Sequence, residues 1–450
     1  MNSAHEVLCI DIGSGGVSAA RFDEHLTVRG YDEIPWGNEL PSPKALDEFY
    51  RRLLQTFEYD TPPAAICIAS FMHSYMLRYG PFNASRAFET WLSYSPSEGM
   101  EFIRRSIGTN FHRRTGCHYH PMFPVFKLAS VPIAPWYEIL SPKAFLVESL
   151  TGSFVDDYGM ASATGLLNIQ SGTWDDEILR AAQLNPESLP RLADASAIVG
   201  ENSQGSRIVN GSGDGFMANI GSGCENSDRI AITIGTSAAV RQMVNEPILN
   251  STAGTFCYRA GSRNSFLLGC ASSNGGNVLD WARSIGAESE QRPSRDIPIF
   301  LPWLNGERSL EWNPELKPVW HGRRSNHSPN QLRRAITEGV VFNLSQYVEV
   351  IEKVSGIRAG QMVFSGNGFL DAAVAPMLAA LLNRDARQPK AAGYGTLRGA
   401  AVTAWRALGH DAVPEIERML LRTEPVKPMD DEFLQERFLR FKELRNSARS

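Results

Sequence analysis

The chain has 450 residues, of which 43% are hydrophobic and 21% charged, and its formal net charge is −5. It is long enough for two or three globular domains with sizeable cores. The small acidic charge argues against nucleic acid or an anionic membrane surface as a partner.

The cysteines and the hydrophobic pattern indicate a cytoplasmic protein. Six cysteines are scattered without a Cys-x-x-Cys pair, namely Cys9, Cys67, Cys117, Cys224, Cys257 and Cys270. This pattern favours reduced, buried thiols over disulfides or zinc ligands. The N-terminus lacks the basic start of a signal peptide, and no apolar run reaches the ~18–20 residues of a membrane span.

The first predicted element is a β-meander over residues 6–35, whose opening strand ends in Ile10-Asp11-Ile12-Gly13-Ser14. Apolar residues at helical spacing predict a helix over residues 43–58. A buried strand over residues 64–70 then leads into Met72 and His73. The histidine is either a packed side chain or a ligand, and its place in a turn after a core strand favours the ligand role.

Two motifs flank a helix that is predicted over residues 143–152. Residues 115–129 read TGCHYHPMFPVFKLA, and residues 157–167 read DYGMASATGLL. Lys127 in the first motif either approaches a substrate or caps a helix, and both roles are left open.

The most informative stretch is residues 211–240, which places the carboxylate of Asp214 on a glycine-rich turn. Further along, a β-rich run over residues 230–234 ends in Gly235-Thr236-Ser237. Glycines let the backbone approach a ligand closely, and backbone N–H groups and hydroxyls at such a turn can hold phosphate oxygens. An acid beside a phosphate turn is a natural base for a hydroxyl that attacks phosphorus. The alternative is a surface turn followed by an ordinary hairpin.

Two hairpins far apart in the chain are similar. Residues 10–14 read IDIGS and residues 232–236 read ITIGT, and each follows an apolar β-rich run. This recurrence indicates two similar domains that face one ligand. Such a pair would hold a polyphosphate between two glycine turns, and the chain would cross between the domains near residues 213–228.

In the C-terminal half, Asn274-Gly275-Gly276 precedes a helix that carries Trp281. Residues 301–308 read LPWLNGER, and we interpret Glu307 and Arg308 as an ion pair that locks the domains together. Gly399 is expected to let a late helix pack closely. The other predicted elements are a long helix over residues 329–354, a strand over 363–368 that enters the turn Gly366-Asn367-Gly368, a helix over 370–382 and a polar helix over 430–450.

The paired hairpins resemble those of the actin-like ATPase superfamily, and the motifs between them narrow the resemblance to the FGGY carbohydrate kinases. The chain looks most similar to gluconate kinases, chiefly through the run over residues 157–167. The resemblance covers residues 6–405, with the motifs in the family's order. It implies an α/β fold of two ribonuclease-H-like domains that flank a catalytic cleft. Residues 1–220 would carry the sugar side and the first phosphate hairpin, and residues 221–450 the second phosphate hairpin and the adenosine site.

The resemblance implies ATP-dependent phosphorylation of a sugar or sugar acid, and the favoured acceptor is gluconate, which would give 6-phosphogluconate. Asp214 would be the catalytic base, and Asp11 would hold Mg²⁺ through water. The residues expected to bind the sugar are Met72, His73, Lys127 and Asp214. Those expected to bind ATP are Gly13, Ser14, Gly235, Thr236, Ser237, Gly275, Gly276, Gly366, Asn367 and Gly368. Relatives are often dimers, which leaves a homodimer open.

Three features depart from the family's pattern. Ser18 stands where the first hairpin usually carries Lys or Arg, a cation that would neutralise phosphate charge. Ser93 and Ser95 follow Trp91 in place of the acid and the arginine of a W-x-D-x-R element. The adenosine turn reads Gly-Asn-Gly instead of Gly-Gly, a mild change because Asn tolerates the left-handed conformation.

These departures keep alternatives open. One is a kinase for another pentulose or polyol, such as xylulose. Another is a sugar-binding or nucleotide-binding relative that has lost catalysis, for which Asp214 would be unnecessary. An actin-like chaperone is disfavoured by the sugar-side segments at residues 72–74, 115–128 and 157–167.

Overall fold

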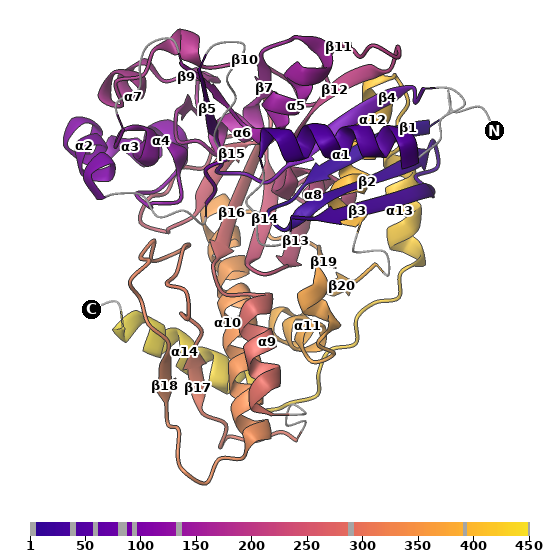
Figure 1. The fold of residues 1–450 in the computed structure, drawn as a ribbon. Helices are drawn as coiled ribbons and strands as arrows, with labels where there is room; N and C mark the ends of the chain where they lie inside the picture. Colours follow the sequence, from indigo (N-terminus) through magenta and orange to yellow (C-terminus); the bar gives the residue numbers. More distant parts are fainter. Residues whose placement is uncertain are drawn as a thin grey trace.

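The chain folds into two six-stranded sheets, one in each half of the sequence (Figure 1). The computed structural model describes residues 6–36, 42–56, 62–79, 88–91, 97–131, 137–286, 292–389 and 394–448. The first sheet has the order β11-β12-β4-β1-β2-β3. Its strands are β1 (Glu6–Ile12), β2 (Gly16–Asp23), β3 (Val28–Pro35), β4 (Ala65–Ser70), β11 (Ile198–Glu201) and β12 (Arg207–Gly213).

The first sheet is antiparallel on one side and parallel on the other. The strands β1, β2 and β3 form the predicted meander, whereas β4 runs parallel to β1 and β12 runs parallel to β4. Val7 to Ile10 of β1 are fully buried, and so is all of β4, as expected for strands that are covered on both faces. Because β1, β4 and β12 are parallel, their carboxyl ends meet at one edge of the sheet, where α/β proteins bind ligands.

The second sheet repeats this plan with the order β15-β16-β14-β13-β19-β20. The hairpin of β13 and β14 is antiparallel, β16 joins it beyond β14, and β19 and β20 extend the sheet in parallel on the other side. The recurring hairpins of the sequence therefore belong to two sheets of similar topology. The strands are β13 (Arg229–Ile234), β14 (Ala238–Val244), β15 (Phe256–Arg259), β16 (Phe266–Ser272), β19 (Gln361–Ser365) and β20 (Asp385–Arg387).

Two helices, α8 (Asp214–Gly221) and α12 (Gly395–Ala407), join the two sheets. One hydrophobic cluster contains residues of both sheets and of both helices. A Cβ atom on Gly399 would lie 1.8 Å from the carbonyl oxygen of Met217, so only glycine permits this approach of the helices. The close packing expected at Gly399 is confirmed. Although α12 comes from the end of the chain, it packs against β1 and β4 of the first sheet (Figure 1).

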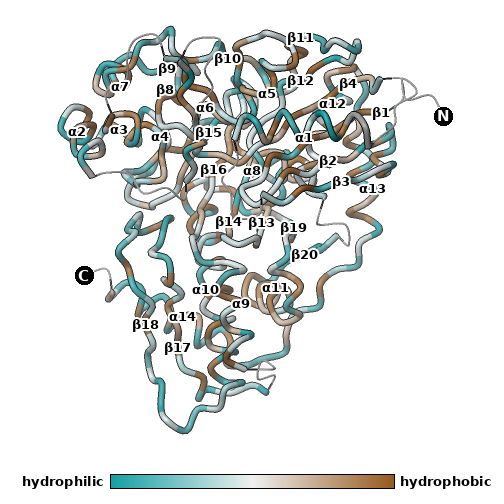
Figure 2. Tube along the Cα trace, in the orientation of Figure 1, coloured by the Kyte–Doolittle hydropathy of each residue, from teal (hydrophilic) through white to brown (hydrophobic). Residues whose placement is uncertain are grey.

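Further helices cover the other faces of the sheets. The helices α1 (Pro43–Thr56) and α5 (Pro142–Thr151) pack on the first sheet, and α9 (Gly276–Ile285), α10 (Pro329–Ser355) and α11 (Val374–Leu382) pack on the second. Figure 2 shows hydrophobic residues along the inner strands and helices, and hydrophilic residues along outer loops such as that between β18 and α10. This distribution is that of two packed α/β layers.

Smaller elements surround these layers. The helices are α2 (Ser97–Ile107), α3 (Asn110–Thr115), α4 (Pro124–Leu128), α6 (Tyr158–Ser162), α7 (Asp176–Ala181), α13 (Val413–Arg422) and α14 (Leu434–Ser447), with 3₁₀ helices η2 (Pro186–Ser188) and η3 (Asn367–Leu370). The strands are β5 (Met76–Tyr79), β6 (Tyr137–Leu140), β7 (Val155–Asp157), β8 (Leu167–Asn168), β9 (Thr173–Trp174), β10 (Arg191–Ala193), β17 (Ile299–Leu301) and β18 (Val319–His321).

The predicted helices over residues 143–152 and 329–354 agree with α5 and α10 to within one residue at each end. The helix predicted over residues 43–58 agrees with α1 as far as Thr56, and its last two residues lie outside the described part of the chain. The helix predicted from residue 370 begins only at Val374, because the 3₁₀ helix η3 occupies the preceding turn. All six cysteines are buried free thiols. None of the helices in the described ranges combines the length and apolar character needed to cross a membrane.

The last helix, α14, is tied to the second half by a buried arginine. Arg445 is fully buried and donates two hydrogen bonds to the carboxylate of Glu311, at 2.7 Å from Nε and 2.5 Å from Nη2. On the same helix, Arg440 forms a 2.9 Å pair with Glu443 in which both side chains are more than half exposed. The two arginines thus provide a buried and an exposed ion pair for comparison.

We predict that Arg445→Met lowers the free energy of unfolding by about 3–5 kcal/mol, because the buried carboxylate of Glu311 would lose its guanidinium partner. The matched Arg440→Met change should cost no more than about 1 kcal/mol. Urea denaturation followed by circular dichroism measures both values. Equal effects of the two variants would show that the buried pair has no special role in stability.

Candidate active site

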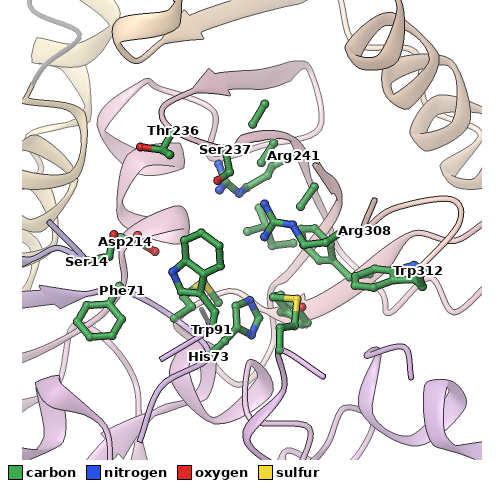
Figure 3. Close-up of a pocket in the computed structure, with 18 residues that line it drawn as sticks. Ser14, Phe71, His73, Trp91, Asp214, Thr236, Ser237, Arg241, Arg308 and Trp312 are labelled. Atoms are coloured by element: carbon green, nitrogen blue, oxygen red, sulfur yellow. The ribbon is translucent and has the colours of Figure 1, made fainter. Parts of the chain in front are cut away.

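A cavity of about 200 Å³ lies where the carboxyl ends of β1, β4 and β12 meet the turn between β13 and β14 (Figure 3). Side chains from both halves of the chain line it. The cavity lining includes the predicted ligand residues Ser14, Met72, His73, Asp214, Thr236 and Ser237. An adjoining cavity of about 320 Å³ shares Thr236 and Ser237 and extends toward Ser273 and Asn277 at the start of α9.

Two carboxylates lie at the carboxyl ends of β1 and β12, the strands on either side of β4, and of these Asp214 lines the cavity while Asp11 does not. Asp214 is the first residue of α8, and its Oδ1 accepts a 2.7 Å hydrogen bond from the backbone N–H of Gly215. Asp11 lies near the end of β1. Burial raises the pKa of Asp214, and burial together with the charge of Asp214 raises the pKa of Asp11 from 3.8 to about 7. A hydrogen bond from Thr396 at the start of α12 acts against this rise.

The surroundings of Asp11 fit a hydrated divalent cation. Its Oδ1 is buried and has no hydrogen-bond partner among the described residues. Such an oxygen is costly unless a ligand meets it. Mg²⁺ is usually bound by only one or two carboxylates and completes its shell with water and substrate phosphates. In the described ranges no group of three or more His, Cys, Asp or Glu side chains could hold a metal, so Asp11 fits the sparse donor set of Mg²⁺ better than a dedicated metal cage.

The two glycine turns that we expect to hold phosphate have defined partners. The backbone N–H of Gly13 donates to the carbonyl of Gly16 at 2.8 Å, which closes the first turn and leaves Ser14 exposed. In the second turn, the carbonyl of Gly235 accepts a 2.8 Å hydrogen bond from the N–H of Gly276. A Cβ atom on Gly276 would lie 2.4 Å from this carbonyl oxygen, so the contact between the turn and α9 requires glycine.

The third glycine segment packs against the end of β13. Gly366 has a φ of 94°, and a Cβ atom there would lie 2.3 Å from the carbonyl oxygen of Ile234. A Cβ atom on Gly368 would lie 2.1 Å from the Ile234 side chain. The turn over residues 366–368 therefore lies directly beside the second phosphate turn, which begins at Gly235.

His73 has the geometry of a neutral hydrogen-bond acceptor. Burial lowers its pKa to about 3. Its Nδ1 donates a 2.8 Å hydrogen bond to the carbonyl of Ala163, which leaves the lone pair of Nε2 free to accept a hydrogen bond. The φ of His73 is 59°, a conformation that is uncommon outside glycine and is often found at functional sites. The motif over residues 157–167 therefore acts on the cavity indirectly, by orienting this ring.

Lys127 is not part of the cavity lining. Its Nζ is buried and donates a 2.5 Å hydrogen bond to the carbonyl of Thr90. Burial lowers its pKa to about 8. The side chain therefore holds the segment that carries Trp91, which does line the cavity, and direct contact of Lys127 with substrate has no support in this geometry.

The interpretation of Glu307 and Arg308 as an ion pair is wrong. The carboxylate of Glu307 accepts hydrogen bonds from Ser272 at 2.9 Å and from Asn343 at 3.0 Å. Arg308 instead donates to the carbonyl of Ser272 at 2.6 Å and lines the cavity. The two side chains point to different partners because β16 and α10 supply better hydrogen bonds to the acid.

The cavity contains two cations that sequence reasoning did not assign to it, Arg308 and Arg241 of β14. Ser18, which replaces the family's usual cation, lies opposite Asp11 in the first hairpin. Arg241 extends from the second sheet to the start of α8. A Cβ atom on Gly215 would lie 3.0 Å from the Nη2 atom of Arg241. The sequence signal for Arg241 is a cation four residues beyond the second hairpin turn. Ser93 and Ser95 lie outside the described residues.

Comparison with known proteins identifies the family. The model of the FGGY family of carbohydrate kinases, N-terminal domain, matches residues 7–221, and that of the C-terminal domain matches residues 230–408. The chain is 28% identical over 388 residues to a gluconokinase of Bacillus licheniformis, which covers 75% of each protein. It is 29% identical over 322 residues to a xylulose kinase of Escherichia coli, with 66% of this chain and 64% of that protein covered.

Solved structures of the same kinds are also similar. A gluconate kinase of Lactobacillus acidophilus superimposes with a TM-score of 0.86 at 24% identity and covers 99% of this chain and 98% of its own. A xylulose kinase from the same species reaches a TM-score of 0.87 at 26% identity, with 98% of both chains covered. The whole described fold is therefore that of a two-domain sugar kinase.

The raised pKa of Asp11 predicts a pH dependence of stability in the protein without ligands. The folded state binds this proton more tightly than the unfolded state, so stability falls as pH rises between about 4 and about 7, by at most ~1.4 kcal/mol per pH unit. Asp11→Asn has no such titration, so its stability relative to wild type should improve steadily over this window. Urea midpoints measured in EDTA at several pH values test this. A difference between the proteins that does not change with pH would contradict it.

Proposed function

The chain belongs to the FGGY family of carbohydrate kinases, and we propose that it transfers the terminal phosphoryl group of ATP to gluconate, giving 6-phosphogluconate. The observation that carries this proposal is the place of Asp214 between two groups of residues. On one side are the hydroxyls of Ser14, Thr236 and Ser237, and on the other is the pocket around His73. A hydroxyl that lies against Asp214 would thus face the phosphates.

Asp214 acts as the general base in this proposal. It takes the proton of the terminal hydroxyl while the hydroxyl oxygen attacks the γ-phosphorus, and the bond from that phosphorus to the bridging oxygen of ADP breaks. The raised pKa of Asp214 makes it a stronger base than an exposed carboxylate. His73 accepts a hydrogen bond from another acceptor hydroxyl through Nε2 and so orients the chain of hydroxyls.

The ATP site is assigned from the glycine segments. Gly13, Gly235 and their neighbouring hydroxyls hold the phosphates, the segment at Gly275 and Gly276 supports the second turn, and residues 366–368 border the adenosine. Asp11 holds Mg²⁺, which when bound would neutralise charge on the phosphates. We assign the enzyme to the cytoplasm because ATP is available there. The reducing environment of the cytoplasm also suits its buried free thiols.

A second acceptor, xylulose, is supported by the similar xylulose kinases. Gluconate is favoured because two arginines line the acceptor pocket. Loss of catalysis, suggested by Ser18, is disfavoured because Asp214 is retained beside the phosphate turns and Arg241 supplies a cation from the second sheet.

An ADP-release assay over gluconate, xylulose, ribulose and glycerol tests the proposal. We expect ADP release to depend on the acceptor, with the highest kcat/KM for gluconate. A clear preference for xylulose would reassign the acceptor while keeping the reaction. If none of the acceptors causes ADP release, the enzyme activity itself is contradicted.

We predict that Asp214→Asn lowers kcat by a factor of ~10²–10⁴, because the amide cannot take the hydroxyl proton. Its KM for ATP should remain close to the wild-type value. Asp11→Asn should weaken ATP use as well as turnover, since it loses the metal partner. The exposed Asp176 of α7 provides a matched control. Turnover near the wild-type rate in Asp214→Asn would place the base elsewhere.

A further inference from the structure

Two arginines with few partners face the acceptor pocket. Arg241 and Arg308 both line the cavity, and Figure 3 shows their guanidinium groups directed into the same space. Within the described residues neither guanidinium has a carboxylate oxygen within the 4.0 Å limit of an ion pair. By contrast, the buried arginines Arg334, Arg437 and Arg445 each form such a pair, at 2.5–2.7 Å. The cavity arginines therefore differ from these three in having no carboxylate partner within the described residues.

Their hydrogen-bonding capacity is largely unused. Arg308 is 8% exposed, its Nη2 donates to the carbonyl of Ser272, and its Nε is buried without a partner among the described residues. Arg241 makes one long contact, 3.5 Å from Nη1 to the hydroxyl of Thr233. A guanidinium has five N–H donors in a planar fork. Most of these donors remain available to a ligand.

The charge of Arg308 also acts against the charged form of Arg241. Burial is the largest effect and lowers the pKa of each arginine. The charge of Asp214 raises the pKa of Arg241 and that of Glu307 raises the pKa of Arg308, while the charge of Arg308 lowers the pKa of Arg241. Glu307, the acid next to Arg308 in the chain, is held away by Ser272 and Asn343. Buried like charges of this kind are costly unless an anion completes the site. The arrangement is that of a site prepared for an anion.

The position of Arg308 favours the acceptor over the phosphates as the source of this anion. Arg308 lies 5.8 Å from the centre of the Trp91 ring, on the aromatic side of the cavity. The phosphates have their own backbone N–H groups and hydroxyls at the glycine turns. Asp214 and both arginines line the same small cavity, so one extended molecule can contact Asp214 with a hydroxyl and the arginines with its other end. A carboxylate matches a guanidinium fork through two parallel hydrogen bonds.

We propose that Arg241 and Arg308 bind the carboxylate of the acceptor and make the enzyme selective for aldonates over neutral polyols and ketoses. This inference rests on the proposed function, because it assigns the specificity of the same pocket. Both cations come from the C-terminal half, whereas Asp214 follows the last strand of the first sheet. An aldonate therefore bridges the two halves of the enzyme.

Isothermal titration calorimetry without nucleotide tests the assignment. Gluconate and its neutral analogue glucitol are titrated into wild type, Arg241→Gln, Arg308→Gln and Arg308→Lys. Wild type should bind gluconate at least ~10-fold more tightly than glucitol, and each glutamine variant should weaken gluconate binding ~10–100-fold, as expected for lost hydrogen bonds between charged groups. Arg308→Lys should retain part of the affinity. A matched control is Arg259→Gln, since Arg259 is buried without an ion pair in the described structure but lies outside the cavity lining.

Equal affinity of wild type for gluconate and glucitol would overturn the inference. The inference would also be overturned if the glutamine variants raised the KM for ATP and left gluconate binding unchanged. The arginines would then bind the phosphates of ATP instead of the acceptor. Thermal melting of each variant separates loss of binding from loss of folding. Because calorimetry needs no turnover, an enzyme that binds gluconate and releases no ADP would contradict the proposed function and leave the arginine site supported.

Discussion

The close contact between α8 and α12 is the constraint on which the site depends. A Cβ atom on Gly221 would lie 1.9 Å from the carbonyl oxygen of Gly395, and one on Gly399 would lie 1.8 Å from that of Met217. No other residue type fits these positions without moving a backbone. The contact sets the end of α8 against the start of α12, and α12 also packs on β1. Asp214 at the start of α8 and Thr396 near the start of α12 both alter the pKa of Asp11.

The cleft contains acidic and basic side chains that come from different parts of the chain. Asp11 and Asp214 come from the first sheet and its connection to the second, while Arg241 and Arg308 come from the second half. Each acid is held above its ordinary pKa and each arginine below its own, chiefly by burial. In the proposed function, charged groups of the ligands would replace water in this site. Electrostatic interactions are stronger where water is excluded.

Sequence reasoning predicted the features that are encoded by short, continuous stretches of the chain. The hairpins at residues 10–14 and 232–236 predicted two similar domains that face one ligand, and the place of His73 in a turn after a core strand predicted a ligand role for it. It did not predict Thr396 as a neighbour of Asp11, because the insertion of α12 against the first sheet depends on contacts between distant parts of the chain. It also misjudged Arg308, since adjacency to Glu307 suggested an ion pair that Ser272 and Asn343 prevent.

The central claim is that the acceptor hydroxyl lies between Asp214 and the phosphates. The most direct measurement is a crystal structure of the Asp214→Asn variant with gluconate and a non-hydrolysable ATP analogue. We expect the terminal hydroxyl oxygen of gluconate at ~2.6–3.2 Å from the side chain at position 214 and facing the γ-phosphorus. A terminal hydroxyl that lies away from position 214, with the γ-phosphate directed to another residue, would contradict the account.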